Sequence, residues 1–260
     1  MTEREILISH CVDKINSASE NMMITSTDFL SCEEKSEIIN LHKRYSRDAD
    51  IYFYGGYGEA ERTVALFVPK CFGFQGDSSD LLNEYPDSNP VAVIRLTKDK
   101  FSSASHRDYL GALMGLGIKR KLIGDILVFD WGAYIFVFDS IKDFICDNLD
   151  QCGRASVRCE AVTPSAMELP DERTDTVFHS VASMRLDNIL SAGFGLSRTV
   201  CTQAIASGIV FVNSVKAEKN DFQIHENDKI VLRGKGKIVV ENIIGRNKKD
   251  RIHINIRHYK

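Results

Sequence analysis

Long apolar runs, paired cysteines and a leader pattern are all missing from this sequence. No apolar run reaches the ~18 residues that a membrane-spanning helix needs, so we expect neither a span nor a membrane partner. Residues 1–20 mix charged and apolar side chains, which is not the pattern of a signal peptide. The seven cysteines include no Cys-x-x-Cys pair, and an odd number argues against a disulfide framework and against a zinc ribbon. We therefore expect a cytoplasmic protein with reduced thiols.

Motifs for nucleotide binding and catalysis are also missing. Gly55, Gly56 and Gly58 make a glycine-rich stretch, but no Gly-Lys-Ser/Thr follows, so we predict a tight turn instead of a phosphate loop. The sequence has no nucleophile elbow and no metal-ligand cluster. Four isolated histidines lack a motif partner: His10, His42, His179 and His225. We therefore expect no catalytic residue, no metal and no cofactor.

The charge of the chain is divided unevenly. Its length of 260 residues favours two or three small modules. Residues 1–180 hold 19 Lys and Arg against 29 Asp and Glu, a net charge of −10, whereas residues 181–260 hold 14 against 7, a net charge of +7. Such asymmetry indicates that the C-terminal third contacts a polyanion.

The pattern of elements predicts an α+β protein. We expect a helical N-terminal segment over residues 1–62, with one helix near its start and another at about 33–45. Residues 73–90 are rich in Gly, Asp, Ser and Pro and predict a loop. From Val91 onward the order is β-α-β-β-α-β, the split-βαβ pattern of ferredoxin-like (RRM-like) domains, and we assign residues 63–165 to this middle domain.

Aromatic residues alternate along one predicted strand of that domain. Tyr134, Phe136 and Phe138 share one face of the strand, where related domains stack RNA bases. The segment nevertheless lacks the basic residue and the glycines of the RNA-recognition signature. We therefore predict that these aromatic side chains pack in the core.

A basic run follows the first helix of the middle domain. Lys119, Arg120 and Lys121 come just after Gly117, where cations suit the negative end of the helix dipole. Three cations in a row, with Arg107 at the other end of the same helix, could instead contact phosphate. Both interpretations stay open for this possible second RNA contact.

The C-terminal third predicts a small helical module followed by short strands. Residues 163–180 carry Pro164, Pro170 and a charged stretch, so we expect a linker at 166–180, or an extended strand, between the modules. Within residues 181–245, a short helix ends near Gly195, and Ser197 is a good N-cap for a second helix that ends at Gly208. Short strands are expected at 209–212, 215–217 and 230–233, and residues 246–260 are expected to be a basic tail.

This segment closely resembles the small RNA-binding domain first known from ribosomal protein S-four. The matching elements, in the expected order, are Arg185-Leu186-Asp187, Leu190, Ser197-Arg198, Ile205, Gly208, Val210, Val212-Asn213, Asp228, Ile230 and Arg233-Gly234. The resemblance implies two helices and a small β-sheet that present basic side chains to folded RNA. It implies the following RNA-binding residues: Arg185, Ser197, Arg198, Lys216, Arg233, Lys235 and Lys237. Asp187 is expected to pair with Arg185 rather than to act on RNA.

At the level of the whole chain, the sequence resembles the YlmH family of bacterial proteins. The similarity lies in residues 106–128, 55–62 and 231–251. It implies an RNA-binding factor of the large ribosomal subunit that meets rRNA and tRNA or peptidyl-tRNA. It also implies a role in ribosome-associated quality control, where a tailing-factor protein partner extends the stalled chain at its C-terminus.

Two other functions remain open at this stage. Pseudouridine synthases, which are RNA-modifying enzymes, often carry the same small domain beside a catalytic domain with an Arg-Leu-Asp motif. Here the Arg-Leu-Asp at 185–187 belongs to the binding domain itself. A cell-division-linked assembly factor, with incidental RNA binding, is the other alternative.

Overall fold

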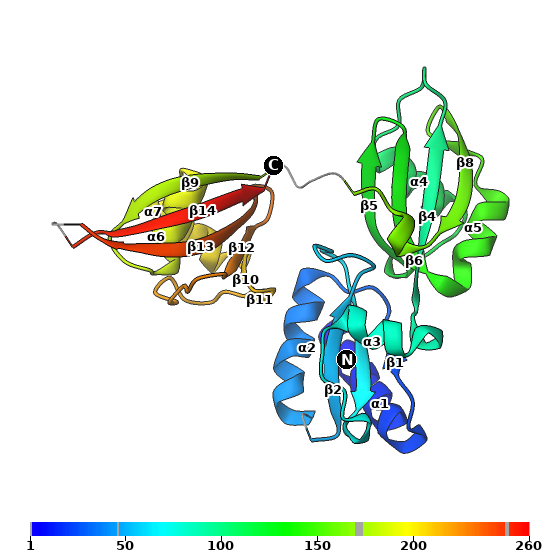
Figure 1. Cartoon of the computed structure of the whole chain (residues 1–260), viewed down its shortest axis with the longest axis horizontal. Coiled ribbons are helices and arrows are strands. Elements are labelled where there is room, and N and C mark those ends of the chain that lie inside the picture. Colours follow the sequence, from blue (N-terminus) through cyan, green and yellow to red (C-terminus); the bar gives the residue numbers. More distant parts are fainter. Residues whose placement is uncertain (1, 46, 170–173, 248–249, 260) are drawn as a thin grey trace. The chain divides into compact units, whose positions relative to one another are not determined.

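The chain folds into two compact units. A computed structural model describes residues 2–45, 47–169, 174–247 and 250–259. The first unit is Met1–Glu168 and the second is Leu169–Lys260. Figure 1 shows the elements of each unit, which we describe separately. We call residues 2–90 the N-terminal subdomain and residues 91–168 the middle domain; together they make the first unit.

The N-terminal subdomain is a three-stranded sheet covered by two helices. Its helices are α1 (Glu3–Asn21) and α2 (Cys32–Tyr45), and the sheet order is β1-β3-β2. The strands are β1 (Thr25–Ser26), β2 (Ala49–Tyr54) and β3 (Val64–Pro69). A capping box between Thr2 and Glu5 starts α1. The short elements that follow are η1 (Lys70–Phe72), α3 (Ser78–Glu84) and η2 (Pro86–Ser88).

The middle domain has the expected split-βαβ topology. Its strands are β4 (Val91–Lys98), β5 (Ile123–Phe129), β6 (Gly132–Phe138), β7 (Gln151–Cys152) and β8 (Ala155–Val162), in the order β5-β6-β4-β8-β7. The helices α4 (His106–Gly115) and α5 (Lys142–Asn148) pack on one face of this antiparallel sheet (Figure 1). Three single 3₁₀ turns complete the domain: η3 (Arg120–Leu122), η4 (Asp139–Ile141) and η5 (Pro164–Ala166).

The other face of the middle sheet is covered by the N-terminal subdomain. Strand β3 is buried along its whole length, because one side packs under α1 and α2 while the other packs against the middle sheet. Tyr134 and Phe136 are buried in this junction and Phe138 is half-buried, which confirms that the aromatic strand packs in the core. The ring of Tyr57 stacks on that of Phe136 at 4.9 Å between centroids.

A close backbone approach explains the glycine-rich turn. Gly56 has φ +96°, and a Cβ at this position would lie 2.3 Å from the Phe136 ring. Only glycine lets the backbone pass so close to the aromatic face. The turn prediction for residues 55–58 is therefore confirmed, and packing on Phe136 is its physical reason.

The C-terminal unit is a six-stranded antiparallel sheet with two helices on one face. The helices are α6 (Leu186–Phe194) and α7 (Arg198–Ala206). The sheet order is β11-β10-β12-β13-β14-β9. Its strands are β9 (Thr174–Val181), β10 (Val210–Val212), β11 (Val215–Lys216), β12 (Lys229–Leu232), β13 (Gly236–Arg246) and β14 (Ile252–Tyr259). Both helices bury apolar side chains against β10, β12, β13 and β14.

Three expected assignments differ from the structure. Residues 174–180 form an extended strand, one of the two expected alternatives, whereas residues 252–259 are not tail, because they pair with β9 as strand β14. Residues 73–90 are not wholly loop, because Asp77 caps helix α3 through the Ser79 and Asp80 amides. Strand β3 belongs to the N-terminal sheet, so the N-terminal segment is not only helical and the ferredoxin-like sheet begins at β4, not at residue 63. Each difference comes from a partner that is distant in sequence or from a local cap.

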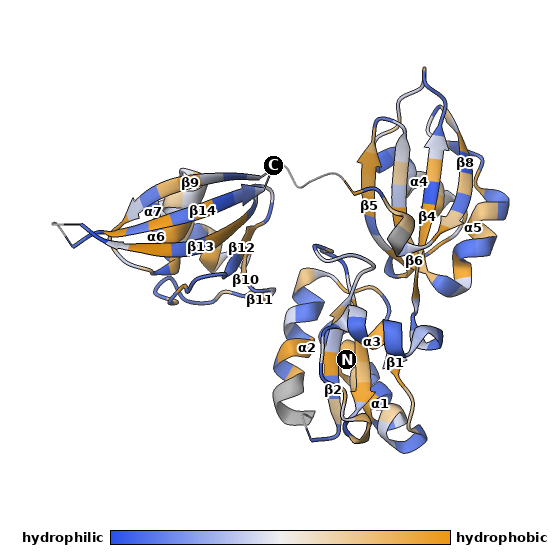
Figure 2. Cartoon of the chain, viewed as in Figure 1, coloured by the Kyte–Doolittle hydropathy of each residue, from blue (hydrophilic) through white to orange (hydrophobic). Residues whose placement is uncertain are grey.

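Hydropathy follows the burial of the elements. In Figure 2, helices α2 and α5 each carry separate hydrophobic and hydrophilic stretches, as expected for helices with one face on a sheet. Within the described residues, no helix is both long and apolar enough to cross a membrane.

The junction between subdomain and middle domain predicts a large stability effect. We expect Phe136→Ala to lower the free energy of unfolding by about 3–5 kcal/mol, because it leaves a cavity between two packed layers. Urea denaturation followed by circular dichroism measures this. The matched control is Phe144→Ala, since Phe144 on α5 is 48% exposed, and it should change stability by less than about 1 kcal/mol. Equal losses in the two variants would contradict the packing.

Candidate nucleic-acid interface

The two helices of the C-terminal unit hold three of the predicted RNA-binding residues at their N-termini: Arg185, Ser197 and Arg198. Helix α6 ends at Gly195, which has φ +63°, and α7 begins directly after Ser197. Ser197 Oγ accepts a hydrogen bond from the Val200 amide at 3.4 Å, so the predicted N-cap is confirmed. In the turn, Ser191 Oγ donates to the Leu196 carbonyl at 2.6 Å. This places Arg198 at the first turn of α7 with an exposed side chain.

Arg185 and Asp187 form a two-pronged ion pair at the start of α6. Arg185 Nε lies 3.1 Å from Asp187 Oδ1, and Arg185 Nη2 lies 3.0 Å from Asp187 Oδ2. Asp187 Oδ1 also accepts the Asn188 amide at 3.0 Å. The expectation that Asp187 pairs with Arg185 is confirmed. One edge of the Arg185 guanidinium is thereby occupied, and its other edge remains the part that can face a phosphate.

The charge state of Asp187 depends on these neighbours. Asp187 is only 8% exposed, and burial by itself raises the pKa of its carboxyl. The hydrogen bonds and charge of Arg185, helped by the Asn188 amide and by the charge of Arg198, outweigh burial and lower the pKa below its usual value. Asp187 is therefore a stably ionised anchor that orients Arg185.

A pocket of about 270 Å³ lies between the end of β9, helix α6 and the start of α7. Arg198 and Arg251 both line it, together with Asn188, Ser191, Ser180 and His179. Arg251 donates through Nε to Ser180 Oγ at 3.1 Å and through Nη2 to the Ser180 carbonyl, so its side chain is held in place. Two guanidinium groups at one small pocket, beside a helix N-terminus, make a suitable environment for a phosphate.

One buried amide in this pocket has an unsatisfied atom. Asn188 is 7% exposed; its Nδ2 donates to Ser183 Oγ at 2.6 Å, and its Oδ1 has no partner among the described residues. Because a hydroxyl can donate as well as accept, rotating the amide by 180° keeps the Ser183 bond and makes the NH₂ group the unpaired one.

The remaining predicted cations form a second group at the other end of α7. Arg233 lies 5.4 Å from the centre of the Phe211 ring, and its amide donates to the Ile209 carbonyl, just past the end of the helix. Lys237 Nζ lies 3.7 Å from the centre of the Tyr259 ring. Lys235 is exposed in the turn before β13, and Lys216 on the edge strand β11 packs against Gly208. A nine-residue helix is about 13 Å long, so the predicted cations make two groups rather than one.

The possible second contact in the middle domain is also divided. Arg107 is in the first turn of α4, whereas the basic run follows the other end of that helix. Arg120 donates through Nη1 to the carbonyls of Ile123 and Gly124, and Lys121 Nζ lies 2.6 Å from Asp28 of the N-terminal subdomain. Lys121 therefore joins the subdomain to the middle domain, whereas Arg120 is held within the middle domain and Lys119 is exposed.

Sequence reasoning missed two residues of the pocket. Arg251 was placed in a basic tail, and Asn188 was not singled out. The alternation of Ile252, Ile254 and Ile256 was an available signal, because period-two alternation predicts a half-buried strand with Arg251 at its start. Asn188 has no comparable signal, since only the tertiary contact with Ser183 distinguishes it.

Metal-ligating side chains and thiols are dispersed in this structure. Among the residues that the structure describes, no three His, Cys, Asp or Glu side chains lie together in a way that could hold a metal ion. The seven cysteines form no disulfide in this structure. Burial raises the pKa of the Cys152 thiol to about 12.

The Arg185–Asp187 pair gives a pH-dependent stability prediction. Because the pKa of Asp187 is lowered on folding, its contribution is present above about pH 4 and is lost as the pH falls through the folded-state value. We expect Asp187→Asn to lower the free energy of unfolding by about 1–3 kcal/mol at pH 7 and by much less near pH 3. Denaturant titrations at both pH values measure this.

The control for Asp187 is an exposed carboxylate in the same unit. Asp250 pairs with Arg246 at 2.8 Å, but its side chain is 81% exposed. Asp250→Asn should change stability by less than about 0.5 kcal/mol at either pH. Should Asp187→Asn behave like this control, the ion pair would not be the anchor of α6.

Comparisons with known proteins agree with this architecture. Residues 91–166 match the family described as a putative RNA-binding domain in YlmH, and residues 184–230 match the S4 domain. The chain is 30% identical over 241 residues to the ribosome-associated protein quality control protein P2 of Bacillus subtilis, covering 93% of this chain and 90% of that protein.

A solved structure supports the fold. The cell division protein ylmH from Streptococcus pneumoniae aligns with a TM-score of 0.50 and 21% identity, over 64% of this chain and 94% of that one. At this identity the likeness concerns the fold alone. The two matched domains, together with the long alignment to the Bacillus protein, show that this chain belongs to the YlmH family.

Proposed function

We propose that this chain is a non-catalytic RNA-binding factor that associates with the large ribosomal subunit and with tRNA or peptidyl-tRNA. In this role it supports C-terminal tailing of stalled chains during ribosome-associated quality control, with a tailing-factor protein as its partner. The proposal places the protein in the cytoplasm. The name of the Bacillus relative, which covers nearly the whole chain, supports the quality-control part.

The observation that carries the proposal is the position of Arg198. A cation at the first turn of a helix is unfavourable for the helix dipole, so a neighbouring anion is the natural reason for it. Arg198 is exposed beside Arg251 at one small pocket, in the domain that matches the S4 family. A phosphate group would interact favourably with both arginines and with the helix N-terminus.

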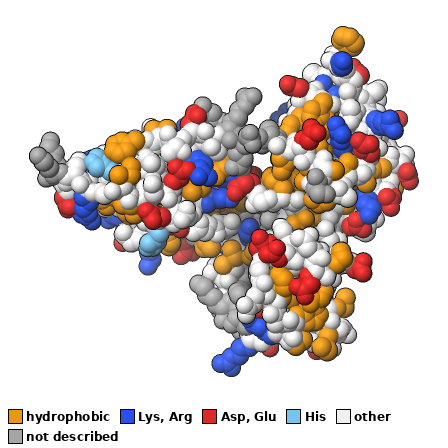
Figure 3. Space-filling model, viewed as in Figure 1, with side chains coloured by type: hydrophobic (Ala, Val, Ile, Leu, Met, Phe, Trp, Pro, Cys, Tyr) orange, Lys and Arg blue, Asp and Glu red, His pale blue; other side chains and the backbone are white. Residues whose placement is uncertain are grey.

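The charge division of the chain supports the same role. The surplus of cations lies in residues 181–260, which include both cationic groups of the C-terminal unit. Figure 3 shows the charged side chains on one face of each unit; blue and red ones lie close together. On a surface of mixed charge, RNA binding depends on a few arginines at fixed positions that contact phosphates, and not on an evenly positive surface.

Three charge reversals test the proposal. We expect the variant Arg185→Glu, Arg198→Glu, Arg233→Glu to lose association with purified bacterial large ribosomal subunits in sedimentation at low salt, because its cations become repulsive to phosphate. The control reverses the charge of three cations of the first unit that pair with acidic residues: Arg4, Lys70 and Lys142. It changes the net charge equally and should still co-sediment. If the first variant co-sediments with large subunits as well as wild type does, the proposed RNA-binding surface is wrong.

A single substitution gives a finer test. Arg198→Ala should weaken binding by about 1–3 kcal/mol and reduce the slope of log affinity against log salt by about 1, since one phosphate contact is lost. Its melting temperature should stay within about 2 °C of wild type, because the side chain is exposed. An unchanged salt slope would show that Arg198 contacts no phosphate.

A further inference from the structure

One end of the middle domain presents an aromatic side chain entirely to solvent. Phe101, in the loop between β4 and α4, is 101% exposed, more than any other large hydrophobic side chain among the described residues. Figure 3 shows a hydrophobic side chain with a basic one beside it at the tip of this loop. A single exposed apolar side chain is common on protein surfaces, so the surroundings of Phe101 decide whether it has a role.

The loop that carries Phe101 is held in shape by hydrogen bonds. Asp99 Oδ1 accepts the amides of Phe101 at 3.0 Å and Ser102 at 2.9 Å, and Asp99 Oδ2 accepts Ser102 Oγ at 2.6 Å. Lys98 Nζ donates to the Ser102 carbonyl at 2.8 Å. The turn therefore holds the loop in one conformation with Phe101 exposed, so the loop loses little conformational entropy when a partner binds.

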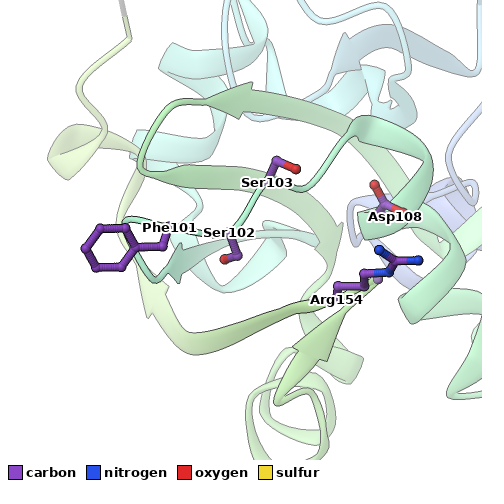
Figure 4. Close-up of a pocket in the computed structure, with 6 residues that line it drawn as sticks. Phe101, Ser102, Ser103, Asp108 and Arg154 are labelled. Carbon is purple, nitrogen blue, oxygen red and sulfur yellow. The ribbon is translucent and has the colours of Figure 1, made fainter.

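Beside this loop is an open hollow of about 590 Å³ with polar walls. Ser102, Ser103, Asp108 and Arg154 line it. In Figure 4, Asp108 and Arg154 lie on one side of the hollow, and the ring of Phe101 projects away on the other. An aromatic ring and a guanidinium thus stand on opposite sides of one exposed depression.

The charges at this end of the domain favour an anionic partner. Four exposed cations gather there: Lys100, Arg107, Arg154 and Arg158. The neighbouring carboxylates Asp99 and Asp108 stay ionised, because hydrogen bonds from Ser102 and Ser105 lower their pKa values, but the four cations outnumber these two. As a whole the first unit is acidic, since residues 1–168 hold 18 Lys and Arg against 26 Asp and Glu. This end is therefore a local exception.

Part of the usual RNA-binding face of this fold is covered here. In related domains, aromatics on the central strands stack bases, but here Phe136 is buried under the Gly56–Tyr57 turn of the N-terminal subdomain, and Tyr134 is buried against Phe129 and Trp131. Lys121 pairs with Asp28 of the N-terminal subdomain, and Arg120 is bonded to the Ile123 and Gly124 carbonyls. Of the predicted second contact, Arg107 is exposed in the first turn of α4, next in sequence to Asp108, which lines the hollow.

We infer that Phe101 stacks on an unpaired base of ribosomal RNA while Lys100, Arg107 and Arg154 contact the neighbouring phosphates. The inference rests on the proposed association with the large subunit and gives it a second contact, in the middle domain. Aromatic rings bind bases of any sequence through their faces, and the flanking cations add a salt-dependent component.

The test replaces Phe101 in the full chain and measures affinity for purified bacterial large ribosomal subunits. Phe101→Ala and Phe101→Leu should each weaken binding roughly tenfold, whereas Phe101→Trp should retain it, because stacking needs an aromatic face. All three should keep the wild-type melting temperature. Phe144→Ala, an exposed phenylalanine on α5, is the matched control and should bind like wild type.

The phosphate contacts have their own readout. Arg154→Ala should lower the salt slope by about 1, while Lys142→Ala, which removes a cation from α5, should leave it unchanged. A photo-crosslinking phenylalanine analogue at position 101 should attach to rRNA. Crosslinks to a ribosomal protein, or equal binding by the leucine variant and wild type, would overturn the inference.

The two proposals fail in different ways. If Phe101→Ala binds like wild type while the triple charge reversal in the C-terminal unit abolishes binding, only the second contact is wrong. If wild-type protein itself shows no salt-sensitive association with large subunits, the proposed function is wrong and the second contact with it.

Discussion

The packing of the N-terminal sheet on the aromatic face of the middle sheet is the constraint on which the first unit depends. It buries Tyr134 and Phe136 and makes β3 an interior strand with apolar residues on both sides. Polar contacts seal its edge: Arg62 donates to the carbonyls of Phe29 and Ile123, and Asp125 accepts the Tyr57 hydroxyl. A face that could have bound RNA is thereby converted into core, and nucleic-acid contacts are left to the ends of the domain.

The C-terminal unit solves a different problem, because it must keep cations exposed on short helices. Asp187 holds Arg185 in a two-pronged pair, Ser197 caps α7, and Ser180 fixes Arg251. Arg185 and Arg251 are thus each positioned by a neighbour that is itself at least partly buried, and Arg198 is placed by the start of α7. Preorganised arginines lose less conformational entropy on binding a phosphate than arginines in a loose tail do.

The site could be predicted in part from sequence. The Arg-Leu-Asp and Ser-Arg pairs located Arg185 and Arg198 correctly at the starts of two helices, because capping and helical periodicity are local properties. Arg251 and Asn188 could not be assigned, since their significance comes from meeting Arg198 across the fold. The basic run was ambiguous in sequence, because the partner of Lys121 is Asp28, which lies 93 positions earlier in the chain.

The sequence by itself determined the α+β class, the split-βαβ order from Val91, the helix pair with its caps and the cationic C-terminal third. These follow from short-range patterns: periodicity, turn residues and charge. Only the tertiary structure decided that residues 174–181 and 252–259 are paired strands, that β3 joins the N-terminal sheet and that the aromatic face is covered. Strand pairing and face-to-face packing bring together residues that are far apart in the chain. A local pattern can therefore show that one face of a strand is apolar, but it does not identify the element that packs on that face.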